Sequence, residues 1–160
     1  MPNWCENYVT FHHTDVKKLD GLEQAAIEGE VLQYIHPMPK ELEGTTAPSE
    51  GLNWYNWCTS NWGTKWDFGP EDGHLDRGDD YVAFSFMSAW SPPIGAYEYA
   101  VENGWEIQAT YVEPAMDFIG EFSSDEGENT YSLDEAPEWL KSDYEWVYED
   151  LAEWERENEA

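Results

Sequence analysis

Basic residues are scarce in this sequence, and their scarcity limits the partners that the protein can have. The 160 residues include 7 Lys and Arg against 35 Asp and Glu, so the formal net charge at pH 7 is −28. Proteins hold phosphate backbones mainly through Lys and Arg, and anionic membranes attract the same side chains. The composition therefore argues against direct binding to nucleic acid or to a membrane surface.

Cysteine and long apolar runs are also scarce. The two cysteines, Cys5 and Cys58, are interpreted as free thiols of an intracellular protein. No apolar run approaches the roughly 18 residues that a membrane-spanning helix needs. The start of the chain lacks the basic region and apolar segment of a signal peptide. We therefore expect a cytoplasmic protein.

Aromatic residues, by contrast, are abundant enough to build a core. The chain contains 10 Trp, 10 Tyr and 6 Phe, and hydrophobic residues make up 41% of it. High net charge is typical of disordered chains only where hydrophobic residues are few. The length and this composition therefore indicate one folded domain.

The spacing of apolar residues predicts an α+β domain. Alternation predicts strands over residues 4–12, 31–36, 81–89, 105–111, 115–122 and 128–132. Helical spacing predicts a helix capped by Thr14 that ends near Glu28, and another that begins at Pro92 and ends at Asn103. The order of these elements favours a largely antiparallel sheet.

A long acidic helix is predicted at the C-terminus, over residues 134–158. We assign 1–133 to the main domain and 134–160 to this helix, packed on the same domain. Its apolar row has heptad-like spacing: Leu140, Tyr144, Val147, Leu151 and Trp154. Its acidic row and one neighbour form a candidate partner-binding surface: Glu145, Glu149, Asp150, Glu153 and Glu157.

The acidic row has three interpretations. Like charges four residues apart on a helix cost a few tenths of a kcal/mol per pair, so stability alone does not favour them. They could mimic a nucleic-acid backbone toward a basic protein, keep an aromatic-rich protein soluble, also in a high-salt source, or bind a metal or a basic peptide. The apolar row 140–154 could instead support self-association into a homo-oligomer.

Tryptophan is concentrated in residues 51–66, where we predict a short helix closed by Gly63. A candidate ligand pocket combines four rings with one ammonium group: Trp54, Trp57, Trp62, Lys65 and Trp66. Aromatic rings can stack a base, a sugar or a cation. The alternative is that these rings only pack in the core, since Trp is highly buried on average.

Signals for metal binding or catalysis are weak. The acids of residues 67–80 do not follow the ligand pattern of a calcium loop, and no Cys or His pairs have zinc-site spacing. Phosphate-binding, dinucleotide-binding and nucleophile-elbow motifs are missing. We therefore expect no metal, no cofactor and no catalytic residues.

Four stretches resemble a known family of small proteins. They are residues 1–7, Ile35–Leu42, Asn61–Asp67 and Phe86–Pro93. Over residues 1–122 the chain resembles the YubB-like family of phage and conjugative-plasmid proteins, whose function is not established. The resemblance implies a ferredoxin-like α/β sandwich, here with an insertion at about 43–80, and action inside a bacterial cell. It implies no iron–sulfur chemistry, since two cysteines cannot hold a cluster that needs four ligands.

The leading hypothesis is a non-enzymatic interaction protein from a phage or plasmid. Its acidic face would bind a basic host protein, such as a DNA- or RNA-binding defence protein, and inhibit it. The alternatives are a ligand-binding or enzymatic protein built around the tryptophan cluster, and a self-associating structural or accessory protein.

Overall fold

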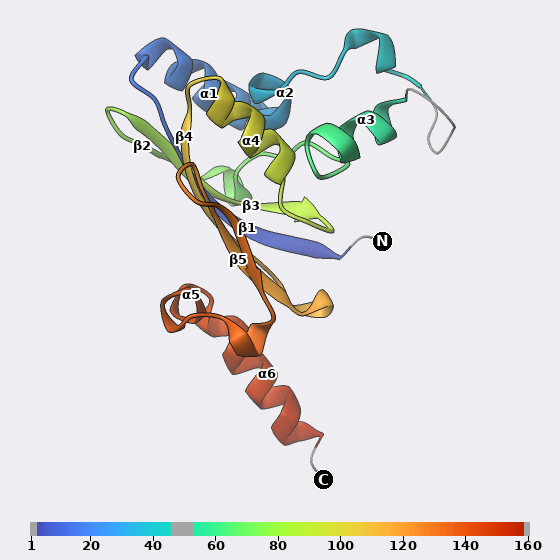
Figure 1. The fold of residues 1–160 in the computed structure, drawn as a ribbon, viewed down its shortest axis with the longest axis vertical. Helices are drawn as coiled ribbons and strands as arrows, with labels where there is room; N and C mark the ends of the chain where they lie inside the picture. Colours follow the sequence, from blue (N-terminus) through green and yellow to red (C-terminus); the bar gives the residue numbers. More distant parts are fainter. Residues whose placement is uncertain (1–2, 46–52, 159–160) are drawn as a thin grey trace.

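A computed structural model describes residues 3–45 and 53–158, and its centre is one antiparallel sheet (Figure 1). The strand order is β2-β3-β1-β4-β5-β6. The strands are β1 (Trp4–His12), β2 (Asp76–Arg77), β3 (Tyr81–Ala89), β4 (Glu106–Glu113), β5 (Phe118–Ser123) and β6 (Gly127–Tyr131). Within the described ranges, no helix combines the length and the apolar character that crossing a bilayer requires.

The predicted α+β, ferredoxin-like fold is confirmed. The chain runs β1–α1–β2–β3–α4–β4, where α1 is Val16–Glu28 and α4 is Ile94–Glu102. β1 lies between β3 and β4 and is antiparallel to both, and β2 pairs with β3 at the edge. β5 and β6 extend the sheet beyond β4 as an antiparallel hairpin.

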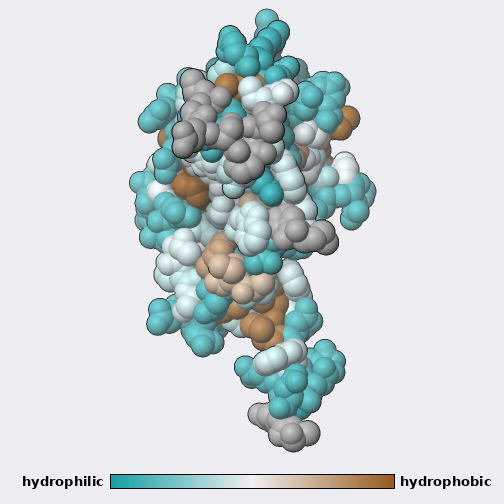
Figure 2. Space-filling model, turned by 90° about the vertical axis from the view of Figure 1, so that its right-hand side faces the viewer, coloured by the Kyte–Doolittle hydropathy of each residue, from teal (hydrophilic) through white to brown (hydrophobic). Residues whose placement is uncertain are grey.

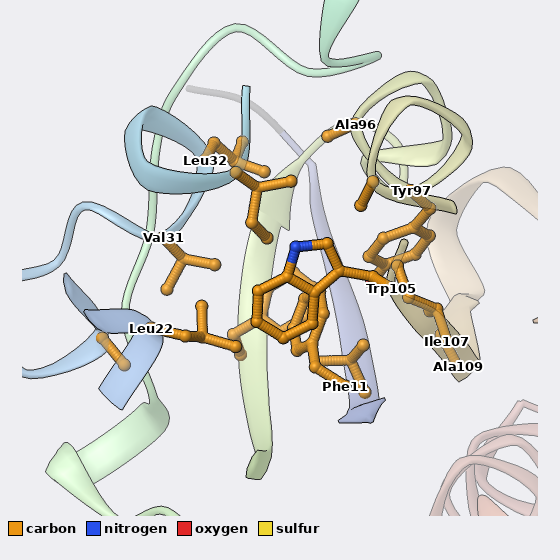
Figure 3. Packing of buried hydrophobic residues seen from close by; sticks show 14 of the residues in the cluster. Phe11, Leu22, Val31, Leu32, Ala96, Tyr97, Trp105, Ile107 and Ala109 are labelled. Atoms are coloured by element: carbon orange, nitrogen blue, oxygen red, sulfur yellow. The ribbon is translucent and has the colours of Figure 1, made fainter. Parts of the chain in front are cut away.

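The main core lies between one face of the sheet and a helical layer. α1, α2 (Val31–Ile35), α3 (Trp54–Asn61) and α4 gather on this face (Figure 1). Alternate residues of β1 and β3 point into this layer and are fully or almost fully buried, as the pleat of a strand requires. Figure 3 shows Trp105 among Leu22, Leu32 and Tyr97, with Phe11 in edge contact at 5.9 Å between ring centroids.

The prediction of a strand over 31–36 is wrong, because these residues form helix α2. The carboxylate of Asp67 accepts hydrogen bonds from the backbone N–H groups of Leu32 and Gln33, at 2.7 and 2.9 Å. These bonds satisfy two donors that the first turn of a helix leaves free. Tertiary contacts from residue 67 thus override the β-propensity of this short apolar run.

The insertion into the ferredoxin-like pattern begins earlier than predicted. It contains α2, the 3-10 helix η1 (Lys40–Leu42), α3 and the 3-10 helix η2 (Glu71–Gly73), and it ends before β2. In the interval 69–80, whose glycines and charged residues predict a loop, Asp76 and Arg77 instead form the edge strand β2. α4 also begins at Ile94 rather than at Pro92, and α1 is capped by the side chain of Asp15 rather than by Thr14.

The C-terminal segment is broken into pieces, whereas one helix was predicted over 134–158. After η3 (Pro114–Met116) and the last hairpin come η4 (Leu133–Glu135), α5 (Glu138–Asp143) and α6 (Glu145–Glu157). The break is at Tyr144, where φ is −126° and ψ is 39°. The buried Tyr144 ring packs beneath the segment, and its hydroxyl is 3.0 Å from the hydroxyl of Thr110 on β4.

This segment packs on the sheet face opposite to the helical layer (Figure 1). It forms a second hydrophobic cluster with β4 and β5: Val112, Ile119, Leu133, Ala136, Leu140, Tyr144 and Val147. Of the predicted apolar row, Leu140, Tyr144 and Val147 are buried, and Leu151 is half-buried. Trp154 is 62% exposed, because the last turns of α6 leave the body of the molecule.

Candidate functional site

The acids of α6 form an exposed row on a projecting helix. Glu145, Glu149, Glu153 and Glu157 all lie within α6, so they follow one another at intervals of about 6 Å. All four and Asp150 are exposed. The ion pairs of the described residues involve Arg77 and Lys141, and none includes an acid of this row. In Figure 2 the projecting end of the molecule is mostly hydrophilic.

A second acidic surface lies on the open part of the sheet, next to the C-terminal segment. Side chains from neighbouring strands meet there in one transverse row, because Tyr8 pairs with Ser85 and Thr110, and Thr110 pairs with Glu121. Tyr8 stands in the middle of this row and is 43% exposed. No helix of the helical layer covers this face, since that layer packs on the other side.

Three hollows meet at Tyr8. One, of about 360 Å³, extends over β4 and β5 to Trp139 and Asp143. Another, of about 380 Å³, reaches from Glu6 to Trp146. The third, of about 390 Å³, lies between β3 and the chain from Glu71 to Asp76. These hollows, with Tyr8 at their centre, are called the acidic groove below.

Carboxylates and rings dominate the acidic groove. The acids that line it are Glu6, Glu71, Asp72, Asp76, Glu121, Glu126 and Asp143. Among the described residues that line the three hollows there is no Lys or Arg. Burial, and then the charge of Glu71, raise the pKa of Glu6. The described lining of the groove therefore offers no Lys or Arg to offset its negative charge.

The predicted tryptophan cluster is divided between the core and the surface. Trp62 is buried, and its ring N–H donates to the carbonyl of His36 at 2.8 Å. Trp57 meets Trp62 edge to face, with ring centroids 5.6 Å apart. Trp54 and Trp57 are partly buried against the main core. These three rings therefore act as packing groups.

The other two members of that cluster lie at the surface. Trp66 is exposed and contacts Trp4, with ring centroids 6.0 Å apart. The ammonium of Lys65 sits 4.1 Å from the centre of the Trp66 ring, a cation–π contact. Lys65 also lines a hollow of about 340 Å³, which it shares with Tyr55 and Trp90 rather than with the four predicted rings.

The described parts of the four motif stretches, residues 3–7, 35–42, 61–67 and 86–93, meet around Trp62 and Gly63. The Ser91 hydroxyl donates to the Gly63 carbonyl at 2.6 Å, and the backbone N–H of Trp90 donates to the Asn3 carbonyl at 2.8 Å. Gly63 has φ +89°, a conformation that favours glycine. Together with the bond from Trp62 to His36, these contacts indicate that the four stretches form one structural junction.

The two thiols are buried, and the described residues form no cluster suited to a metal ion. Cys5 and Cys58 are free and buried. Burial raises the pKa of Cys5 well above its usual range, and burial together with Asp67 raises that of Cys58 to about 11. Neither is a thiolate at neutral pH, which is the form that attacks or binds metal. In the residues that the structure describes, no group of three or more His, Cys, Asp or Glu is placed to hold a metal ion.

Asp67 predicts a pH dependence of stability. Burial raises its pKa from 3.8 to about 6, although three backbone N–H groups donate to its carboxylate. The folded protein therefore holds this proton more tightly than the unfolded chain does. The resulting stabilisation is complete below about pH 4 and is lost as the pH rises through 6. A pKa raised from 3.8 to about 6 corresponds to at most roughly 3 kcal/mol of stabilisation.

The measurement is thermal or urea unfolding at pH 4, 5, 6 and 7, for the wild type and for Asp67→Asn. Acidification also reduces the repulsion among the other acids, so the wild type is compared with the variant at each pH. We expect the wild type to gain about 2 kcal/mol more than the variant between pH 7 and pH 4. Parallel pH profiles would show that Asp67 does not titrate in this range.

The two acidic surfaces adjoin one another. Trp146, in the first turn of α6, lines the groove, and the remaining turns lead away from the body. Sequence reasoning identified the helix but missed the groove, although Glu6, Tyr8 and Thr10 alternate with buried residues along β1. No family model, no curated protein and no solved structure matches the chain.

Proposed function

We propose that this chain is a non-enzymatic interaction protein of a phage or conjugative plasmid, and that it acts in the bacterial cytoplasm. Its acidic surfaces bind a basic host protein, and it needs no cofactor. The observation that carries the proposal is the glutamate row of α6, which is exposed, free of ion pairs within the described chain and held away from the body. Repulsion within such a row opposes helix stability, which favours a functional reason for it.

Mimicry of a nucleic acid is the form of this function that the geometry favours. Glutamates four residues apart on α6 are about 6 Å apart along the axis, whereas duplex DNA carries one charge per ~1.7 Å. The row alone is too sparse, but Asp150 and the acidic groove add further charges beside it. A DNA- or RNA-binding protein would then be drawn to this side by long-range attraction, and its own site would be blocked.

Self-association through the apolar row is less well supported. Leu140, Tyr144 and Val147 are buried against the chain's own sheet, so the greater part of that row is already occupied. The last two members lie on α6 among acids, and a net charge of −28 on each copy opposes close approach of two such helices. The acidic residues are therefore the better basis for a function.

The test is capture of host proteins by the wild type and by a variant with Glu145, Glu149, Glu153 and Glu157 changed to Lys. We expect one basic nucleic-acid-binding protein to be retained at about 100 mM salt and lost at about 500 mM, because salt screens such attraction. The variant should retain at least about 10-fold less of that protein. Quantitative mass spectrometry of the bound fraction gives the measurement.

A matched control changes the same number of charges elsewhere. Glu41, Glu43, Glu98 and Glu102 lie outside the C-terminal segment, and all four are exposed. Changing each to Lys adds two charges, so both variants carry −28 + 8 = −20. Equal loss of the captured protein in both variants would mean that only net charge matters, and the proposal would fail.

A further inference from the structure

We propose that the acidic groove is a binding site for an extended, arginine-rich segment of the basic partner. The inference deepens the proposed function, and rests on it, by naming the chemistry of the partner and the place where it binds. Three observations support it. The sheet face is not covered by helices of the helical layer, three hollows meet at the exposed ring of Tyr8, and the lining carboxylates form no ion pair within the described chain.

The floor of the groove is about as wide as a short extended peptide is long. Ser85, Tyr8, Thr110 and Glu121 lie directly opposite one another on four neighbouring strands. Neighbouring strands are about 4.8 Å apart, so the floor is roughly 14 Å across. An extended chain rises about 3.4 Å per residue, and about four residues therefore cross the floor.

Two walls hold such a segment in place. The chain from Glu71 to Asp76 rises beside β3 on one side of Tyr8. The junction of α5 and α6 rises on the other side, where the hollows are lined by Trp139, Asp143 and Trp146. Because Tyr144 breaks the helix at this point, the two tryptophans can both border the groove. The break in the predicted C-terminal helix thus creates one wall of the site.

The chemistry of the lining selects arginine. Carboxylates on both walls and on the floor accept two parallel hydrogen bonds from a guanidinium group. Tyr8, Trp139 and Trp146 are all substantially exposed, and a guanidinium stacks on such rings through cation–π and planar contacts. A lysine ammonium uses the same charges but stacks less well. An acidic segment, including one from a second copy of this chain, would be repelled.

The test uses fluorescein-labelled hexa-arginine and measures fluorescence anisotropy at about 150 mM salt, a concentration that weakens attraction between exposed charges. The groove variant combines Glu121→Gln with Asp143→Asn. Its control, Glu98→Gln with Glu102→Gln, removes the same charge from exposed positions of α4, on the other face of the sheet. We expect the groove variant to bind about 10-fold or more weakly and the control to change affinity by less than about 3-fold, because each direct contact contributes a factor of a few.

A second pair of variants tests the rings. Trp146 and Trp154 are both exposed tryptophans of α6, but only Trp146 lines a described hollow of the groove. Trp146→Ala should weaken hexa-arginine binding by about 3- to 10-fold and should reduce its preference over hexa-lysine. Trp154→Ala should do neither. Melting curves establish that all the variants remain folded.

Three outcomes would contradict the proposal that the groove binds an arginine-rich segment. They are no binding of hexa-arginine by the wild type, equal weakening by the groove and control pairs, and no difference between the two tryptophan variants. The proposed function fails separately. A captured host protein that is lost on reversal of the α6 charges, but is unaffected by the groove variants, would support the interaction protein and overturn the groove alone.

Discussion

Replacement of Trp62 by alanine is expected to lower the free energy of unfolding by about 3–5 kcal/mol, the range for removing a large buried aromatic side chain. Trp62 follows α3, is almost fully buried, contacts Trp57 and donates to the His36 carbonyl. The substitution leaves a cavity and an unsatisfied carbonyl at the junction of the four motif stretches. Since domains of this kind have total stabilities of about 5–15 kcal/mol, a large part of the stability would be lost.

Urea unfolding followed by circular dichroism measures this loss. Trp66→Ala is the matched control, because Trp66 is 42% exposed and only four residues away, and it should cost less than about 1 kcal/mol. Trp62→Phe keeps most of the buried ring but removes the N–H donor, so an intermediate cost is expected. Equal costs for Trp62→Ala and Trp66→Ala would contradict the packing role.

Replacement of Leu140 by alanine is expected to detach the C-terminal segment before the rest of the protein unfolds. Leu140 is fully buried in the second hydrophobic cluster, and such a change costs about 2–5 kcal/mol. This cluster is separate from the main core and joins α5 and α6 to β4 and β5. The cost therefore falls mainly on the docking of these two helices.

Amide hydrogen exchange resolves this effect by region. In the variant, the amides of α5 and α6 should exchange much faster than in the wild type, while those of β1 keep most of their protection. Leu151→Ala is the control, because Leu151 is only half-buried at the edge of the cluster. A uniform loss of protection in α6 and β1 would show instead that the two clusters unfold as one unit.

The strands with clear alternation were predictable, and the elements that depend on distant residues were not. Val82, Phe84 and Phe86 mark β3 by their spacing alone, and the sequence Asn103-Gly104 marks the end of α4. Residues 31–35 carry no such local signal, because their helical form depends on the Asp67 carboxylate. A hydrogen bond between residues 35 positions apart cannot be predicted from the spacing of apolar residues within one segment.

The break at Tyr144 was hidden for a similar reason. Leu140, Tyr144 and Val147 have spacing that fits one continuous helix, whereas the packing of the Tyr144 ring in the second cluster and its contact with Thr110 depend on the sheet. The acidic groove depends on this break and on the pairing of β1 with β3 and β4. The charge of its residues was readable from the sequence, but their convergence required the three-dimensional fold.

The central place of β1 has a consequence for synthesis on the ribosome. Val9 pairs with both Phe84 and Ala109. The first strand to be synthesised therefore stays unpaired until β3 and β4 have been translated. Sheets closed by such distant pairings fold slowly, and a waiting apolar strand is prone to aggregate. The acids spread along the nascent chain would repel neighbouring chains during that interval, and this repulsion would oppose aggregation before synthesis is complete.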